Sequence, residues 1–374
     1  HGRDTLEWAT MAFDLQERQR AALIRMLNLN EQAQAISTPS TGFGISSESQ
    51  AGWGDSWKVV VYDHHGRDII SPLLNVGALR KQGVTLHMLL DSAREPIGDV
   101  PAVYFCAATE ENIDKIAEDA KRGLYAGMHV NFCARLGREL MEALARRALR
   151  DRSVANITRV YDQYLDFVAL EPSLFSLGFP ECYRAYSAPG AGEAEVSAAL
   201  RRAAFGLFSA VAALGAVPVI RAPKGGAAEV VARELSGMIA DHLASPGAPF
   251  FRGGGGAGGA GAVGAAALLA RPLLVVLDRS ADLVTPLRHG HTYQALVDDA
   301  LPHRLNRVKI EAEGAATKTY DLDKASDKFF KRYAGRPFPE AIEANGAELA
   351  EVGAREAELR RRTDAKGGGG GGDG

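Results

Sequence analysis

Four residues in one short stretch have side chains that bind metal ions or catalyse hydrolysis: Asp278, Asp282, His289 and His291. They follow the apolar run 273–277, which predicts a buried parallel strand, and α/β sheets bind ligands beyond the carboxyl ends of their strands. Metal sites usually show a set ligand spacing or a shared helix face, and neither is present here. We therefore predict no metal ion and no catalytic residue, and interpret Asp278 and Arg279 as an ion pair that fixes a turn. A metal-dependent hydrolase that uses the Asp278/Asp282 turn is the alternative.

The glycine pattern argues against a nucleotide-binding site. No G-x-G-x-x-G sequence follows a strand-like run, and G-x-x-x-x-G-K-[ST] does not occur. Such loops place main-chain N–H groups on phosphates, so a nucleotide would lack its main contacts here. The Lys-Gly-Gly sequence at 224–226 is typical of a turn. We expect no cofactor, and a nucleotide-binding module is a third, disfavoured hypothesis.

Apolar residues in and after a predicted helix at 138–149 form another candidate site. One face of this helix carries Met141, Leu144 and Ala145. Ile157 and Val160 repeat the three-residue spacing after a polar break, which we interpret as a second short helical face. Two such faces can form a shallow groove, or both can simply cover a sheet. The spacing alone favours the second interpretation.

The elements that must position these residues alternate between strands and helices. From residue 57 to residue 149, short apolar runs alternate with helical stretches, and the alternation resumes after residue 190. This order predicts successive three-layer α/β domains with mainly parallel sheets. A helix is also predicted at 15–30, before a segment rich in Ser, Thr, Gly and Gln.

Composition predicts an ordinary globular chain. The 374 residues are 46% hydrophobic and 24% charged, and the net charge of −3 argues against a basic nucleic-acid-binding surface. Cys106, Cys133 and Cys182 are widely spaced, so we expect reduced thiols in the cytosol, the first two as small core residues. No run of about 18 uncharged apolar residues and no secretory signal is present. If the protein works at membranes, we expect partners to recruit it there.

Several long blocks resemble one protein family. LLVVLDRSADLVTPL (273–287) followed by HTYQALVDDAL (291–301) is similar to the passage from the second to the third domain of SM (Sec/Munc-type) proteins. Residues 68–120, which begin DIISPLLNVGALRKQG, resemble the SLY-type branch of that family, and so does RQRAALIRMLNLN (18–30). VYDQYLDFVALEPSLFSLG (160–178) is another similar block. The resemblance runs with gaps from about residue 15 to residue 362.

The resemblance implies a domain order. We expect an N-terminal helix and flexible linker (1–54), a first α/β domain (55–160) and a second, incomplete α/β domain (161–290) with a glycine-rich insertion (245–264). The beginning of a mostly helical third domain (291–366) and a disordered glycine tail (367–374) follow. SM proteins are much longer than this chain, and their third domain is inserted in the second. We therefore interpret the sequence as a fragment, a truncated gene model or a protein that keeps only peptide binding.

The resemblance also implies a function without catalysis: regulation of SNARE-driven vesicle docking and membrane fusion in ER–Golgi transport. The implied partners are the N-terminal peptide of a Golgi syntaxin (a Qa-SNARE) and SNARE complexes. The implied location is the cytoplasm, with peripheral association to ER and Golgi membranes. In SLY-type proteins an aromatic side chain of that peptide enters an apolar pocket of the first domain, whose residues match Met141, Leu144, Ala145, Ile157 and Val160. Flanking basic residues for acidic groups of the peptide are Arg138, Arg146 and Arg147.

Overall fold

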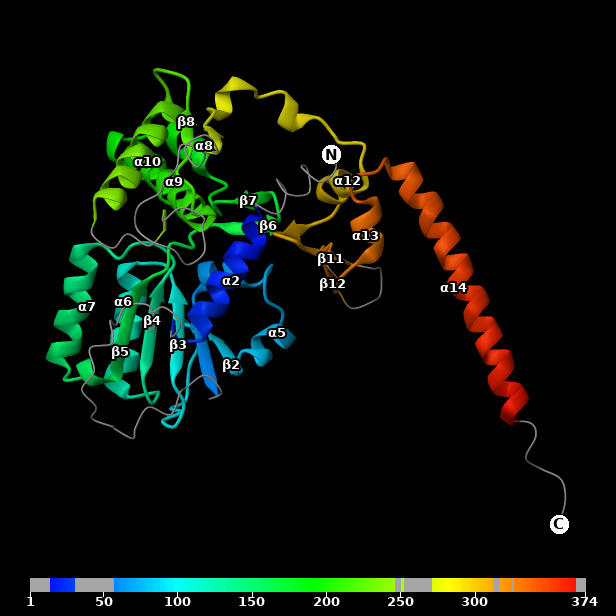
Figure 1. Cartoon of the computed structure of the whole chain (residues 1–374), viewed down its shortest axis with the longest axis horizontal. Coiled ribbons are helices and arrows are strands. Elements are labelled where there is room, and N and C mark those ends of the chain that lie inside the picture. The colour runs from blue at the N-terminus through cyan, green and yellow to red at the C-terminus, as the bar shows by residue number, and fades with distance from the viewer. Residues whose placement is uncertain are drawn as a thin grey trace, which may run out of the picture. The chain divides into compact units, whose positions relative to one another are not determined.

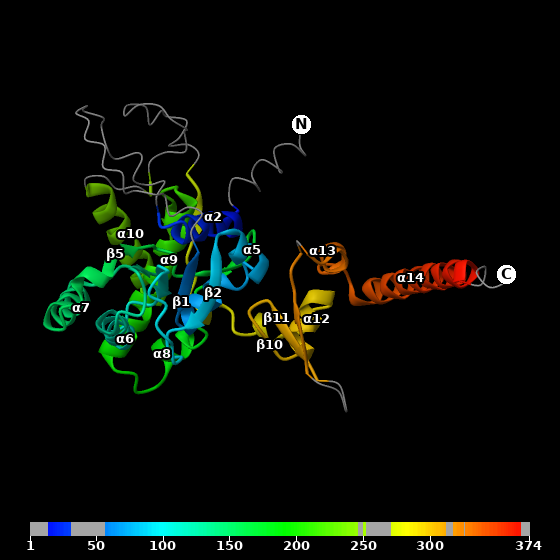
Figure 2. The same ribbon diagram turned by 90° about the horizontal axis from the view of Figure 1, so that it is seen from below.

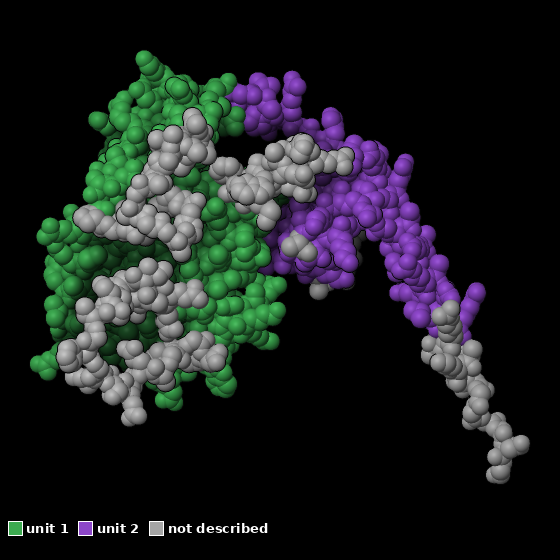
Figure 3. All heavy atoms as spheres, viewed as in Figure 1, with its two compact units in different colours: residues 1–281 green, residues 282–374 purple. Residues whose placement is uncertain are grey.

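The computed structural model describes residues 14–30, 57–245, 250–251, 271–311, 317–324 and 326–367. The chain folds into two compact units, residues 1–281 and residues 282–374 (Figure 3). The predicted linker, most of the predicted glycine-rich insertion and nearly all of the predicted tail lie outside the described residues. The finer domain boundaries that the sequence suggests remain predictions.

A five-stranded parallel sheet forms the centre of the first unit (Figure 1). Its strands are β1 (Lys58–Tyr62), β2 (Val84–Leu89), β3 (Ala102–Cys106), β4 (Met128–Phe132) and β5 (Ile157–Asp162). The strand order is β2-β1-β3-β4-β5, so β2 and β5 are the edges. The central strands β1 and β3 are buried along their whole length, as expected for nearly continuous apolar strands covered on both faces. The predicted parallel α/β fold is confirmed.

Helices α6 (Glu110–Arg122) and α7 (Arg138–Arg150) pack on one face of this sheet, in one hydrophobic cluster with alternate residues of β1, β3 and β4 (Figure 2). Thr109 caps α6, as its sequence predicts, by accepting a hydrogen bond from the N–H of Asn112 at 3.2 Å. Gly123 ends α6 in the left-handed conformation, which glycine adopts at little cost. The short helices α4 (His64–Ile70) and α5 (Val76–Lys81) connect β1 to β2.

The predicted N-terminal helix is α2 (Leu15–Leu27), and it packs against α9 and β6. The amide of Gln19 is fully buried and donates to the carbonyl oxygens of Leu165 and Phe167, while its oxygen accepts from the N–H of Ala169. The Lys58 ammonium donates to the Leu27 carbonyl at the helix end. Because these polar groups are buried and paired, they fix α2 on the sheet in one position.

The rest of the first unit is built around two long helices, α9 (Glu193–Leu214) and α10 (Ala227–Ala244). The other elements are the hairpin of β6 (Val168–Glu171) and β7 (Leu174–Ser176), α8 (Cys182–Ser187), the parallel pair of β8 (Val219–Arg221) and β9 (Leu273–Val275), and η3 (Arg279–Ala281). By length and composition α9 alone among the described helices is a candidate membrane span, but half of it is buried. It packs against α2, α8 and α10, as expected for a core helix.

The predicted strand at 273–277 is parallel, as expected, but it is not buried. Leu273 is 63% exposed and Val275 is 52% exposed. β9 pairs only with β8 within the described residues, and one face of this two-stranded sheet packs inward through Leu274. An apolar run therefore predicted the strand correctly, but it did not predict how much of the strand the neighbours cover.

The second unit combines helices with a small antiparallel sheet. The helices are η4 (Thr285–Leu287), α12 (Tyr293–Ala300), α13 (Lys328–Tyr333) and α14 (Phe338–Gly367), and the strands are β10 (His303–Arg304), β11 (Arg307–Ile310) and β12 (Lys318–Asp321). The helical character agrees with the prediction from the sequence, whereas the small antiparallel sheet was not predicted. The ring of Tyr293 lies 6.0 to 6.2 Å from those of Phe329, Phe330 and Phe338, so aromatic contacts join α12, α13 and α14.

Candidate functional site

The five predicted docking residues lie on α7 and β5, and we call them together the α7–β5 surface. On α7, Met141 is 50% exposed and Leu144 is buried at 4% exposure. Ala145 is exposed beside them. The predicted helical spacing of these three residues is confirmed, since α7 spans all of them.

The other two residues correct the prediction, because Ile157 and Val160 lie on strand β5 and not on a helical face. β-branched residues at 157, 158 and 160 favour an extended chain. Residues three apart on a regular strand face opposite sides of the sheet. Here the register shifts by one residue, so that Ile157 pairs with Met128 and Val160 pairs with Val130. Since those two residues of β4 share one face, Ile157 and Val160 share it as well.

The α7–β5 surface therefore has a buried floor and an exposed part. Leu144 is a member of the core cluster under α7, and Ile157 packs against the same cluster. Met141, Ala145 and Val160 remain exposed, with Val160 at 39%. Exposed apolar side chains above a packed floor can accept an apolar guest. The structure thus supports such a site at this edge of the sheet, while the role of the five residues stays a prediction.

Two of the three predicted flanking arginines have partners within the protein. Arg147 pairs with Asp114 at 2.5 Å and Glu110 at 3.4 Å, which ties α7 to α6. Arg138 pairs with Glu142 at 2.8 Å. Arg146 donates to the main-chain oxygen of Glu142 and forms no ion pair within the described part of the chain. Of the three, Arg146 is therefore best placed to meet a charged ligand.

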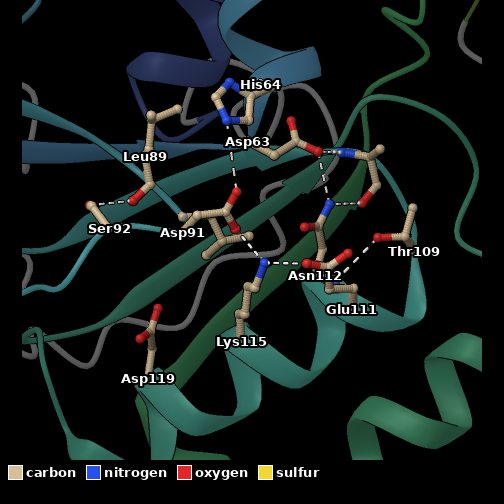
Figure 4. Close-up of polar contacts among 12 residues, drawn as sticks. Asp63, His64, Leu89, Asp91, Ser92, Thr109, Glu111, Asn112, Lys115 and Asp119 are labelled. Carbon is tan, nitrogen blue, oxygen red and sulfur yellow. Dashed lines mark hydrogen bonds and ion pairs between the residues drawn. The ribbon is translucent and has the colours of Figure 1, made fainter.

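At the point of the fold where many α/β sheets bind nucleotides, the protein's own groups bind one another (Figure 4). The strand order reverses between β1 and β3, and Asp63 follows β1 at that point. Its carboxylate accepts hydrogen bonds from the N–H of Gly66 at 2.7 Å, the N–H of Ala107 at 3.0 Å and the amide of Asn112 at 2.8 Å. The donors that would hold a phosphate at this point thus already bind Asp63.

Beside Asp63 lies a surface group of ions, also shown in Figure 4. The ammonium of Lys115 pairs with Asp91 and, at 2.6 Å, with Glu111. The hydrogen bond from Lys115 holds the pKa of Asp91 below its ordinary value. His64 lies 3.9 Å from Asp91. Because these ions are largely exposed and neutralise one another, we interpret the group as a structural link between β2 and α6.

Three of the four residues considered for metal binding have hydrogen-bond partners in the protein. Asp278 accepts hydrogen bonds from the Tyr186 hydroxyl at 2.9 Å and from Ser280, and these bonds fix the turn. Its ion pair with Arg279 stays a prediction. Burial, followed by the bond to Asp278, raises the pKa of Tyr186 to about 12. Asp282 accepts from the N–H groups of Val284 and Thr285, and His289 binds Asp299 at 3.0 Å. Within the described residues no group of three His, Cys, Asp or Glu side chains is arranged to hold a metal ion.

Cys106 and Cys133 lie in the core, as predicted. Burial raises the pKa of both thiols well above the ordinary value, so both are protonated and unreactive at neutral pH. Cys182 is only partly buried. None of the three is part of a disulfide.

Comparison with known proteins gives consistent relatives. The chain is 40% identical over 330 residues to the SEC1 family transport protein SLY1 of Arabidopsis thaliana, which covers 88% of this chain and 49% of that protein. It is 40% identical to the human Sec1 family domain-containing protein 1, over 93% of this chain and 53% of that protein. The chain thus spans about half the length of these relatives.

Solved structures show the same likeness. The crystal structure of Sly1p in complex with an N-terminal peptide of Sed5p matches with a TM-score of 0.74 and 32% identity, over 94% of this chain and 55% of that one. The SM protein Vps45 shares the fold, with a TM-score of 0.68 at 21% identity. The model of the Sec1 family matches residues 58–369. Since that match covers most of the chain, the protein belongs to the Sec1 family.

Proposed function

We propose that this protein regulates vesicle docking and membrane fusion in ER–Golgi transport by binding the N-terminal peptide of a Golgi syntaxin at the α7–β5 surface. The observation that carries the proposal is the likeness to Sly1p, whose structure was solved with an N-terminal peptide of Sed5p. The exposed Met141 and Val160 beside the buried Leu144 support the placement of the site. The protein acts by binding SNARE partners, without catalysis, in the cytoplasm, and partners bring it to ER and Golgi membranes.

One aromatic side chain contributes only part of the binding free energy. Burying a Phe stabilises the complex by about 1.5–3 kcal/mol, whereas a micromolar dissociation constant requires about 8 kcal/mol. Contacts along the rest of the peptide must supply the difference. Arg146 and the edge of β5 are the neighbouring groups that offer such contacts.

Calorimetric titration of the full chain with the N-terminal peptide of a Golgi syntaxin tests the proposal. We expect Met141→Asp and Val160→Asp each to weaken binding at least tenfold, because each places a charge where an apolar side chain docks. Leu144 is less useful for this test, since it is buried and its replacement would also disturb folding.

Leu149→Asp is the matched control. Leu149 lies on the same helix and is 68% exposed, but it is outside the α7–β5 surface. Its replacement should leave the affinity within about twofold of wild type. Equal affinities of the Met141, Val160 and Leu149 variants would place the peptide elsewhere. Failure of the wild-type chain to bind the peptide would refute the proposed partner.

A further inference from the structure

A cavity of about 240 Å³ lies inside the first unit, between α2, the segment that follows β5, and α9. Its described lining contains none of the residues of the α7–β5 surface. The cavity is therefore a separate feature of the fold, and an inference about it does not depend on the proposed function.

Small side chains on two facing helices create this space. Ala22 of α2 and Ala212 and Ala213 of α9 line it, and the two helices pack against each other there. A larger residue at any of these positions would occupy part of the volume. The cavity is thus a direct result of three alanines, and it can be filled by substitution from either wall.

Two aromatic rings form another wall. Tyr164 and Phe250 line the cavity, with ring centroids 5.1 Å apart in an edge-to-face arrangement. Phe208 packs against Tyr164 at 5.5 Å from the other side. Tyr164 has a φ of 51°, in a region that residues other than glycine rarely adopt, and this backbone conformation sets the direction of its ring. Such a wall offers edges and faces to a further aromatic ring.

The charged groups at the cavity favour an anion. Arg18 and Arg25 line it from α2, two turns apart, with Ala22 between them on the same helix face. The carboxyl group in the described lining is that of Asp162, and one of its oxygens already accepts a hydrogen bond from the N–H of Leu136 at 2.9 Å. The positive charge of Arg135 also stabilises the Asp162 carboxylate, which lowers the pKa of that group against the effect of its burial. Arg25 forms no ion pair within the described residues, so its exposed guanidinium is the charged group that can meet an anion at the cavity.

We propose that this cavity binds a small aromatic carboxylate, with its ring between the alanines and the aromatic wall and its anionic group at Arg25. At about 20 Å³ for each non-hydrogen atom in a close-packed interior, the volume accommodates about a dozen atoms. That is one ring with a short acidic chain. The size favours a free small molecule over the end of a peptide, whose main chain would need further room.

Titration of the full chain with 3-phenylpropionate tests the proposal. We expect one saturable site, and binding at least fivefold weaker for 3-phenylpropanamide, which has the same shape without the charge. Ala22→Leu and Ala213→Leu, which fill the cavity from opposite walls, should each weaken binding at least tenfold. Arg25→Gln should weaken binding of the carboxylate several-fold and leave that of the amide unchanged.

Exposed residues of α9 provide matched controls. Ala198→Leu and Arg201→Gln make the same chemical changes outside the described lining and should bind as wild type. Thermal unfolding of each variant shows whether weaker binding comes from a filled cavity or from a misfolded chain. Because Ala22 and Ala213 lie on different helices, one correctly folded filling variant is enough to test the proposal. The proposal is overturned if wild type shows no saturable binding, if a folded filling variant binds as wild type, or if the amide binds as well as the acid.

The peptide Gly-Gly-Phe, which ends in the same ring and carboxylate, should bind at least tenfold more weakly than 3-phenylpropionate. Equal binding would assign the cavity to the end of a peptide chain instead.

Discussion

A buried ion pair and a tyrosine hydroxyl join three separate elements of the first unit. Arg94 and Asp119 are 7% and 3% exposed, and their side chains form two hydrogen bonds at 2.8 and 2.6 Å. The Tyr104 hydroxyl donates to the same carboxylate at 2.9 Å. Burial, together with the charge of Asp119, raises the pKa of Tyr104 well above its ordinary value, so this hydroxyl stays a donor.

Asp119→Ala should lower the free energy of unfolding by about 3–5 kcal/mol, because it leaves the Arg94 guanidinium buried without its partner. Urea unfolding followed by circular dichroism measures this change. The neighbouring Glu118 is exposed and pairs with Lys121 at 3.6 Å on the surface. Glu118→Ala should cost at most about 1 kcal/mol. Similar losses in both variants would contradict this account of the buried pair.

His65 links the start of α4 to the segment before β6. Its Nε2 lies 2.5 Å from Asp166. Burial alone lowers the pKa of His65, but the hydrogen bond and charge of Asp166, with a contribution from Asp63, raise it overall, while Arg202 opposes them. Because the pKa is raised in the folded state, the charged pair stabilises the fold fully below about pH 6.5, the ordinary value of an unfolded histidine. This stabilisation is lost as the pH rises through the folded-state pKa.

Asp166→Asn should therefore destabilise the protein most at about pH 6, by roughly 1–2 kcal/mol, and less at pH 9. Urea unfolding of wild type and variant across this range measures the difference. Asp99→Asn, at an exposed position, is the control and should show no such trend. A constant difference from pH 6 to pH 9 would mean that His65 does not titrate with this carboxylate.

At the scale of elements, the start of α4 requires a glycine. A Cβ on Gly66 would lie 2.3 Å from the main-chain oxygen of Phe105 in β3. Main-chain atoms of a central strand cannot move aside, so α4 approaches β3 this closely only because residue 66 has no side chain. The same residue donates its N–H to Asp63 at 2.7 Å, so the glycine is one of the donors that bind this carboxylate.

Gly66→Ala should cost about 2–3 kcal/mol of unfolding free energy through this overlap. Gly237, exposed within α10, provides the opposite case, because a Cβ added there would meet no described atom within 4 Å. Gly237→Ala should stabilise the chain by about 0.5–1 kcal/mol, because alanine loses less backbone entropy in a helix. Thermal unfolding of both variants checks the contrast, and equal effects would contradict it.

The sequence predicted elements well where local signals decide their structure. Thr109 and the acidic residues after it are a local capping signal at the start of α6, and the apolar runs predicted the parallel strands. The prediction from the sequence was wrong where tertiary contacts determine the secondary structure or the burial of a segment. Ile157 and Val160 have a spacing that suits a helix, but pairing with β4 makes the segment a strand. The exposure of β9 and the hydrogen bonds of Asp63 likewise depend on residues distant in sequence.

At the scale of the whole molecule, the α7–β5 surface lies entirely within residues 1–281. A chain ending at Ala281 should therefore bind the syntaxin peptide within about twofold of the full chain, provided that circular dichroism shows it to be folded. Calorimetric titration of both proteins makes the comparison. A loss of binding by the folded shorter protein would show that the second unit contributes to recognition.

The one-residue register shift between β4 and β5 determines how substitutions near it would affect the residues that β5 exposes. Thr158 is the additional residue, and its hydroxyl lies over Gly127, where a Cβ would be 2.6 Å away. If the strand regained strict alternation without losing a residue, Val160 would point to the opposite side of the sheet. A substitution at Gly127 or Thr158 can thus turn the side chain of Val160 to the opposite face of the sheet, although Val160 itself is unchanged. If the α7–β5 surface binds a partner as proposed, its specificity depends on the pairing of β4 with β5 as well as on the identity of the contacting side chains.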